Sequence, residues 1–158
     1  MHREARHHQR ESLPLDKEVG EILEESRMVL PGVQTLLGFQ FIATFSDLFH
    51  KQLVLREQMI HLLALILVAI SMAVIMTPAA YHRQAEPETV SKRFAQLATL
   101  LLSVGMIPLM FALALDVYVV SFVILHRTDA SLFISLALLC LFATLWFIFP
   151  RMAKRRQY

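Results

Sequence analysis

Four long stretches without Asp, Glu, Lys or Arg constrain the fold more than any other feature of this chain. They cover residues 28–46, 58–82, 94–115 and 130–150, with lengths of 19, 25, 22 and 21 residues. A membrane-spanning helix needs about 20 mostly apolar residues, and helix is required because lipid offers the backbone no hydrogen-bond partner. We therefore predict an all-α, polytopic membrane protein with four transmembrane helices, at about 29–49, 59–78, 94–118 and 130–149.

Composition agrees with this class and excludes several others. Hydrophobic residues make up 56% of the 158-residue chain and charged residues 18%, against about 25% charged in soluble domains. A single cysteine excludes an internal disulfide, and four glycines exclude a glycine-rich phosphate loop. The net charge of +2 gives no argument for nucleic acid. No HExxH, CxxC or GxSxG pattern occurs, so we expect neither an enzyme nor a cofactor.

Lys and Arg flank the predicted spans unevenly. Twelve lie in the N-terminal tail, the second loop and the C-terminal tail, and three lie in the first and third loops. Because cytoplasmic flanks carry an excess of basic residues, both termini are predicted to be cytoplasmic. This divides the chain into a cytoplasmic tail (1–28), a transmembrane domain (29–150) and a basic cytoplasmic tail (151–158).

The tail before the first span contains its own helical pattern. Its apolar residues are spaced i, i+4, i+7 and i+8, at Leu15, Val19, Ile22 and Leu23, which predicts a short amphipathic helix. Pro31 and Gly32 then predict a bend into the first span. The acidic remainder of this helix favours packing on a partner, or on its own bundle, over binding to anionic lipid.

Three segments together resemble a known family. They are residues 24–28 (EESRM), 32–39 (GVQTLLGF) and 77–83 (TPAAYHR). Over about residues 20–125 the chain resembles an uncharacterised family of small bacterial four-helix membrane proteins, whose members are sometimes labelled sodium:proton antiporters. The resemblance implies this fold and a bacterial inner (cytoplasmic) membrane location, and it carries over no site residue.

Two acids fall inside or at the ends of predicted spans, where ionisable residues are costly. Gln40, Thr44 and Asp47 share one helix face, and Asp116 lies in the third span. One interpretation is that these four residues line an ion path. The other is that they form interhelical hydrogen bonds, with Asp47 paired to Lys51.

The depth of Asp116 depends on the register of the third span. If residue 94 lies at the inner surface, Asp116 lies near the outer one. If the turn at 127–129 lies at the outer surface, Asp116 lies toward mid-membrane, and residues 94–104 extend into the cytoplasm. The sequence leaves both registers open.

Three histidines are also predicted near outer helix ends. Because imidazoles and carboxylates bind transition metals and relay protons, His50, His61 and His126 form a candidate metal or proton cluster. The other interpretation is that these histidines are polar only because they contact water at the membrane surface. The spacing matches no known metal signature.

The inner side offers a second candidate group. Arg83 follows the second span closely enough to meet the acids of the amphipathic segment. These residues form a candidate latch: Tyr81, His82, Arg83, Glu24 and Glu25. The alternative is ordinary positive-inside anchoring beside an interfacial tyrosine.

Two functions remain in view from the sequence. The first is ion or proton transport by a homo-oligomer in the bilayer, because four helices seldom enclose a path alone. The second is a non-catalytic accessory or scaffold subunit bound to a partner membrane protein. The transported species, the oligomeric number and the partner stay open.

Overall fold

The computed structural model describes residues 15–85 and 91–155, and all regular secondary structure within them is helical. In chain order the elements are α1 (Leu15–Thr44), α2 (Asp47–Gln52), α3 (Leu55–Ala85), α4 (Lys92–Leu125), α5 (Thr128–Ala143), the π-helical turn η1 (Thr144–Ile148) and α6 (Phe149–Arg155). Residues 1–14 and 156–158 of the two predicted tails lie outside the described residues. So do residues 86–90 of the second predicted loop.

The first helix differs from the sequence prediction. In place of an amphipathic helix and a separate span that bends at Pro31, α1 runs unbroken through Pro31 and ends at Thr44. Proline in a helix removes one backbone hydrogen bond. The helix persists because residues on both sides, Ile22 and Val33, are buried against other helices. The chain then turns at Ser46, whose hydroxyl accepts from the N–H of Phe49 and caps α2.

Three helices are long and apolar enough to cross a membrane, which marks the chain as a membrane protein. They are Leu55–Ala85, Lys92–Leu125 and Thr128–Lys154, the last formed by α5, η1 and most of α6. The helix α1 is not among them: charged residues occupy its first half, and Gln34 and Gln40 interrupt the second. The predicted fourth span therefore stays a prediction.

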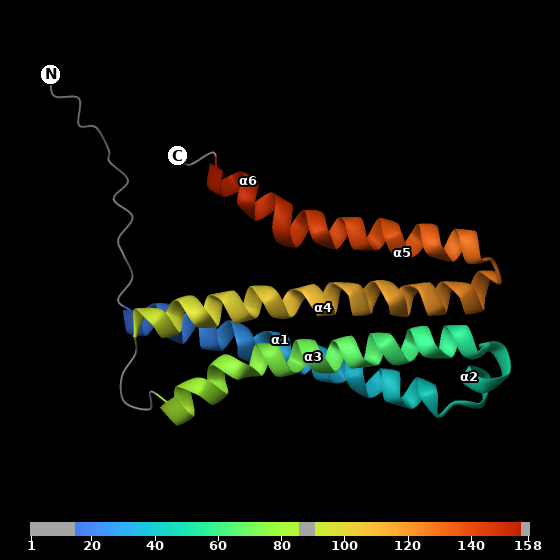
Figure 1. The fold of residues 1–158 in the computed structure, drawn as a ribbon, viewed down its shortest axis with the longest axis horizontal. Helices are drawn as coiled ribbons and strands as arrows, with labels where there is room; N and C mark the ends of the chain where they lie inside the picture. The colour runs from blue at the N-terminus through green and yellow to red at the C-terminus, as the bar shows by residue number, and fades with distance from the viewer. Residues whose placement is uncertain (1–14, 86–90, 156–158) are drawn as a thin grey trace, which may run out of the picture.

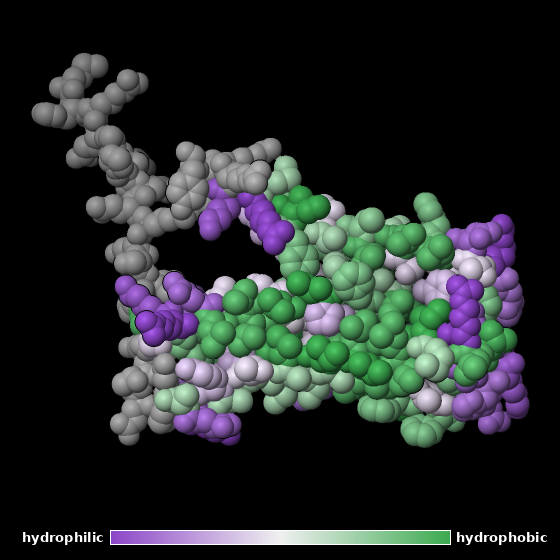
Figure 2. All heavy atoms as spheres, viewed as in Figure 1, coloured by the Kyte–Doolittle hydropathy of each residue, from purple (hydrophilic) through white to green (hydrophobic). Residues whose placement is uncertain are grey.

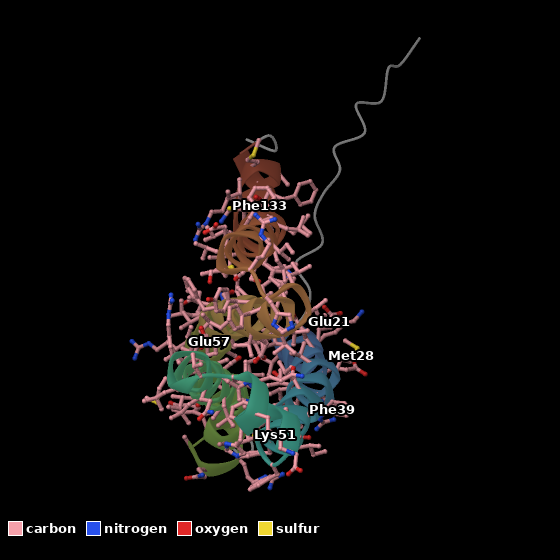
Figure 3. The ribbon with its side chains drawn as sticks, turned by 90° about the vertical axis from the view of Figure 1, so that its right-hand side faces the viewer. Glu21, Met28, Phe39, Lys51, Glu57 and Phe133 are labelled. Carbon is pink, nitrogen blue, oxygen red and sulfur yellow. The ribbon has the colours of Figure 1, made fainter. Side chains whose placement is uncertain are left out.

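The helix α4 lies between the other long helices and contacts α1, α3 and α5 (Figure 1). It packs antiparallel against α3 along most of its length, α1 crosses both, and α5 lies along the opposite side of α4. The helices α3 and α4 approach closely at Gly105, whose carbonyl accepts a 2.7 Å hydrogen bond from Ser71. Figure 3 looks at one end of the bundle and shows α5, with Phe133, standing apart from α1 and α3.

The surface carries the expected zones of a membrane protein. Figure 2 shows a broad apolar band over the middle of the molecule, with hydrophilic residues gathered at both ends. The start of α1 and the end of α6 lie toward the same end (Figure 1). The α2 segment and the α4–α5 turn lie at the other.

The first half of α1 packs on its own bundle. Val19 and Ile22 of the predicted stripe are buried with Phe94, Ala98 and other residues of α3 and α4, and Leu15 and Leu23 pack against them. The charged half of α1 therefore lies beside the first turns of α4.

Replacing Gly105 with alanine is expected to destabilise the bundle. An added Cβ would lie 2.7 Å from Cγ1 of the buried Ile75, so α3 and α4 must separate slightly, at a cost of about 1–3 kcal/mol. Gly38→Ala is the matched control, because nothing lies within 4 Å of its Cβ position. Thermal unfolding in detergent should show a lower midpoint for the first variant only. Equal midpoints for both would contradict the close approach.

Candidate functional site

Three helices bring Gln40, His61 and Asp116 together near the α2 end of the bundle. The Gln40 Nε2 donates to Asp116 Oδ2 at 2.6 Å. The His61 Nδ1 lies 3.5 Å from Asp116 Oδ1, and its Nε2 lies 3.1 Å from the backbone oxygen of Gln40. The site therefore joins one residue each from α1, α3 and α4.

A regular packing pattern places His61 and Asp116 opposite each other. The buried residues of α3 alternate in steps of four and three: Glu57, His61, Ala64, Val68, Ser71, Ile75 and Pro78. Such a repeat keeps one seam facing the partner helix. Asp116 continues the same spacing on α4, between Ala112 and Val119, which are both buried. Ionisable groups thus occupy positions that hold small or apolar residues elsewhere along the seam.

The site is buried, and no Lys or Arg neutralises it. The side chains of His61 and Asp116 are 8% and 16% exposed, and Gln40 is 4% exposed. Within the described residues, the only ionisable group that pairs with Asp116 is His61. A buried carboxylate needs such compensation, since an isolated charge is strongly disfavoured away from water.

The geometry around His61 and Asp116 leaves a place for one further proton. The Gln40 carbonyl oxygen can only accept, so His61 Nε2 must carry the hydrogen in that contact. In a neutral imidazole Nδ1 would then be an acceptor facing the Asp116 carboxylate oxygen, also an acceptor. A proton on either Nδ1 or Oδ1 removes this conflict. The arrangement therefore suits a pair that holds one exchangeable proton.

A hollow of about 380 Å³ opens beside these groups. Gln40, His61 and Asp116 line it, and Phe49 of α2 packs edge-on to the His61 ring at 5.2 Å. The rest of its lining comes mainly from the second half of α1, from α2 and from the end of α4, and is mostly apolar. The polar cluster thus borders a mostly apolar hollow.

A family model described as a family of unknown function (DUF6328) matches residues 8–150. The chain belongs to the DUF6328 family. No curated protein and no solved structure matches it. An uncharacterised family is what the resemblance in the sequence predicted, and it assigns no activity.

The structure divides the predicted polar stripe of this DUF6328 chain. Gln40 and Asp116 meet, and the Thr44 hydroxyl donates to the Gln40 carbonyl oxygen at 3.0 Å. Asp47 does not join them, because the helix ends at Thr44 and Asp47 begins α2. Its side chain is 90% exposed and pairs with Lys51 at 3.3 Å, as the second interpretation predicted.

The predicted outer histidines also separate. His61 is buried at the site, whereas His50 and His126 are exposed. His126 caps α4 in the left-handed region at φ 51°. The described part of the chain has no group of three or more His, Cys, Asp or Glu able to hold a metal. His61 thus joins the Gln40 stripe and not the other histidines.

The predicted inner latch is only partly assembled. Tyr81 and His82 stack on Phe94, with ring centroids 5.8 and 5.3 Å apart. Between the described residues of α1 and α3, Arg83 makes no ion pair with Glu24 or Glu25. All three are exposed, because the packed face of α1 is the Val19–Ile22–Ser26 stripe. The salt-bridge part of the latch stays a prediction.

Sequence reasoning missed Glu57. It is 3% exposed, and its Oε2 has no hydrogen-bond partner. Glu57 lies four residues before His61 and one turn closer to the end of the bundle. The i, i+4 spacing to His61 could have revealed it, but it stands just outside the charge-free stretch at 58–82 and was not considered part of the span.

Replacing Gln40 with leucine is expected to destabilise the protein. Asp116 loses its donor, and an unsatisfied buried polar group costs about 1–3 kcal/mol. Gln34→Leu on the same helix is the control, because Gln34 is exposed and its loss should leave stability nearly unchanged. Unfolding in detergent measures both. Equal changes in stability for the two variants would contradict a stabilising role for the 2.6 Å Gln40–Asp116 hydrogen bond.

Proposed function

We propose that this chain moves protons, or an ion exchanged for protons, across a bilayer as an oligomer. Asp116 and His61 are the proposed proton-binding pair. The observation that carries the proposal is a carboxylate buried within one candidate span and faced by an imidazole from another. Ionisable residues inside spans are functional candidates by default.

Helix lengths support a mid-membrane position for this pair. Ten residues separate Asp116 from the α4 cap at His126, which is about 15 Å of helix. At the other end, the charged half of α1 packs beside residues 94–102, so those turns of α4 belong outside the hydrocarbon layer. Both points favour the second of the two registers, with Asp116 deep in a core about 30 Å thick.

An ionisable group and a hollow adjoin the pair on one side only, among the described residues. Toward the α2 end lie Glu57 and the hollow of about 380 Å³. Toward the other end the seam closes with Ala64, Val68, Leu109 and Ala112, all buried. The nearest polar lining on that side, at Ser103, is about 20 Å along α4. Transport therefore requires a second conformation that opens the closed side.

An oligomer would supply the neighbouring wall that a single copy lacks for an ion path. Only one face of α5 is covered, by Ser131 and Ser135 against α4, and Phe133 is 74% exposed. Such a face suits lipid or a second copy. An oligomer would give the polar pair a neighbouring wall and a route past the closed seam.

The alternative is that the chain is a non-catalytic accessory or scaffold subunit, and one observation favours this. The Gln40–Asp116 hydrogen bond joins α1 to α4, so the same residues can serve only to stabilise the contact between these helices. On this reading the exposed faces of α5 and α1 would bind a partner membrane protein, and no ion would move.

The proposed location is a bacterial inner membrane, with both termini in the cytoplasm. The excess of Lys and Arg in the tails and the second loop supports this orientation. Sodium:proton exchange is one form that the transport could take.

The proposal predicts proton flux in proteoliposomes that contain a pH-sensitive dye. Wild type should acidify or alkalise the lumen when a sodium or potassium gradient is imposed, and Asp116→Asn should abolish this because the amide cannot release a proton. His61→Gln should slow it strongly, since Asp116 loses its proton partner.

Asp47→Asn is the matched control: it removes the same charge from an exposed site and should retain wild-type flux. Incorporation and oligomeric state are compared for every variant. Flux equal to that of empty liposomes would exclude transport of these ions. If Asp116→Asn also prevented assembly, the accessory reading would be favoured.

A further inference from the structure

The hollow beside Asp116 has the size of a small-molecule site. Its volume is about 380 Å³, and pockets for small ligands hold roughly 300–1,000 Å³. Most of its lining is apolar, from residues such as Leu36, Ala43 and Val119. The polar lining residues are fewer: Gln40, Ser46, Gln52, His61 and Asp116.

Two of these polar lining residues have unused hydrogen-bond acceptors. Gln40 Oε1 and Asp116 Oδ1 are buried and have no hydrogen-bond partner, although His61 Nδ1 lies 3.5 Å from the latter. Both residues line the hollow. Buried polar groups are nearly always satisfied in native proteins, so a donor-bearing group from outside the chain would complete this site.

The hollow opens on the flank of the bundle. Phe39, Val120 and Ile124 line it and are also largely exposed on the outer faces of α1 and α4. Figure 3 shows Phe39 on the outward side of α1. Since α4 is a candidate membrane span, a ligand dissolved in the bilayer could enter between these side chains.

We propose that this hollow binds a membrane-soluble amine. Its ammonium group donates to Asp116 Oδ1 and Gln40 Oε1, and its apolar body lies among Leu36, Ala43 and Val119. A carboxylate binds an ammonium group well because hydrogen bonds between charged groups are stronger than those between neutral groups. An anion would be repelled, a quaternary ammonium has no N–H to donate, and a neutral alcohol would leave the charge unbalanced.

This inference rests on the proposed function in one respect, the use of an ionised Asp116. The ammonium and a proton would both bind at the Asp116 carboxylate, so amine and proton compete. Binding does not require transport, however. An equilibrium binding measurement therefore separates failure of this inference from failure of the flux experiment.

The test uses the full chain in lipid nanodiscs and radiolabelled 1-adamantylamine, a compact apolar cage with one primary ammonium. Wild type should bind it saturably, above empty nanodiscs. Unlabelled 1-adamantylamine should compete, whereas 1-adamantanecarboxylate should not and 1-adamantanol should compete weakly. Asp116→Asn should weaken binding by about tenfold or more, because the buried charge partner is lost, and Asp47→Asn should not.

A second pair of variants tests the apolar wall. Ala43→Phe fills the hollow and should abolish binding, while Ala73→Phe, on an exposed face of α3 outside the hollow, should leave it intact. Binding no greater than to empty nanodiscs would overturn the proposal. So would equal competition by the amine and the carboxylate, a comparison that needs no variant and is independent of folding defects.

Discussion

One largely buried carboxylate, Asp116, contacts side chains from two other helices. Asp116 lies in a seam of small and apolar side chains, where an unpaired charge would be strongly unfavourable. Its compensation comes from a different helix on each side: the amide of Gln40 on α1 and the imidazole of His61 on α3. The crossing of α1 over the α3–α4 pair therefore depends on these contacts as well as on apolar packing.

The rest of the seam explains why the polar cluster opens to one end only. Small residues such as Ala64, Ala112 and Gly105 let α3 and α4 approach closely, and this excludes water below Asp116. Above it, α1 ends and the chain turns through the short α2, which leaves the apolar hollow. Close packing on one side and a helix end on the other thus produce a polar pair with one-sided access.

The helical class and three of the apolar spans could be predicted from the sequence, because a charge-free stretch of 20 or more residues is a strong signal. The apolar stripe that includes Val19 and Ile22 could also be predicted, from its helical spacing. The continuity of α1 was not, since Pro31 normally marks a bend and only tertiary packing keeps it helical.

For the site, Gln40 and Asp116 were identified as intramembrane polar residues, but their partners were not. His61 was grouped with His50 and His126 because all three are near helix ends, and sequence position alone does not say which side of a helix faces a neighbour. Asp47 was placed on the Gln40 face by extending the helix past Thr44. Glu57 was overlooked because it borders a charge-free stretch.

If His61 and Asp116 hold one proton as a unit, nuclear magnetic resonance of the protein in bilayers can detect it. The His61 ring nitrogens and the Asp116 carboxyl carbon would be followed together through a pH titration. We predict that Nε2 keeps its hydrogen throughout, bound to the Gln40 carbonyl oxygen, and that Nδ1 and the carboxyl report proton loss at the same midpoint. Loss of the hydrogen from Nε2, or titration of His61 unaffected by Asp116→Asn, would contradict it.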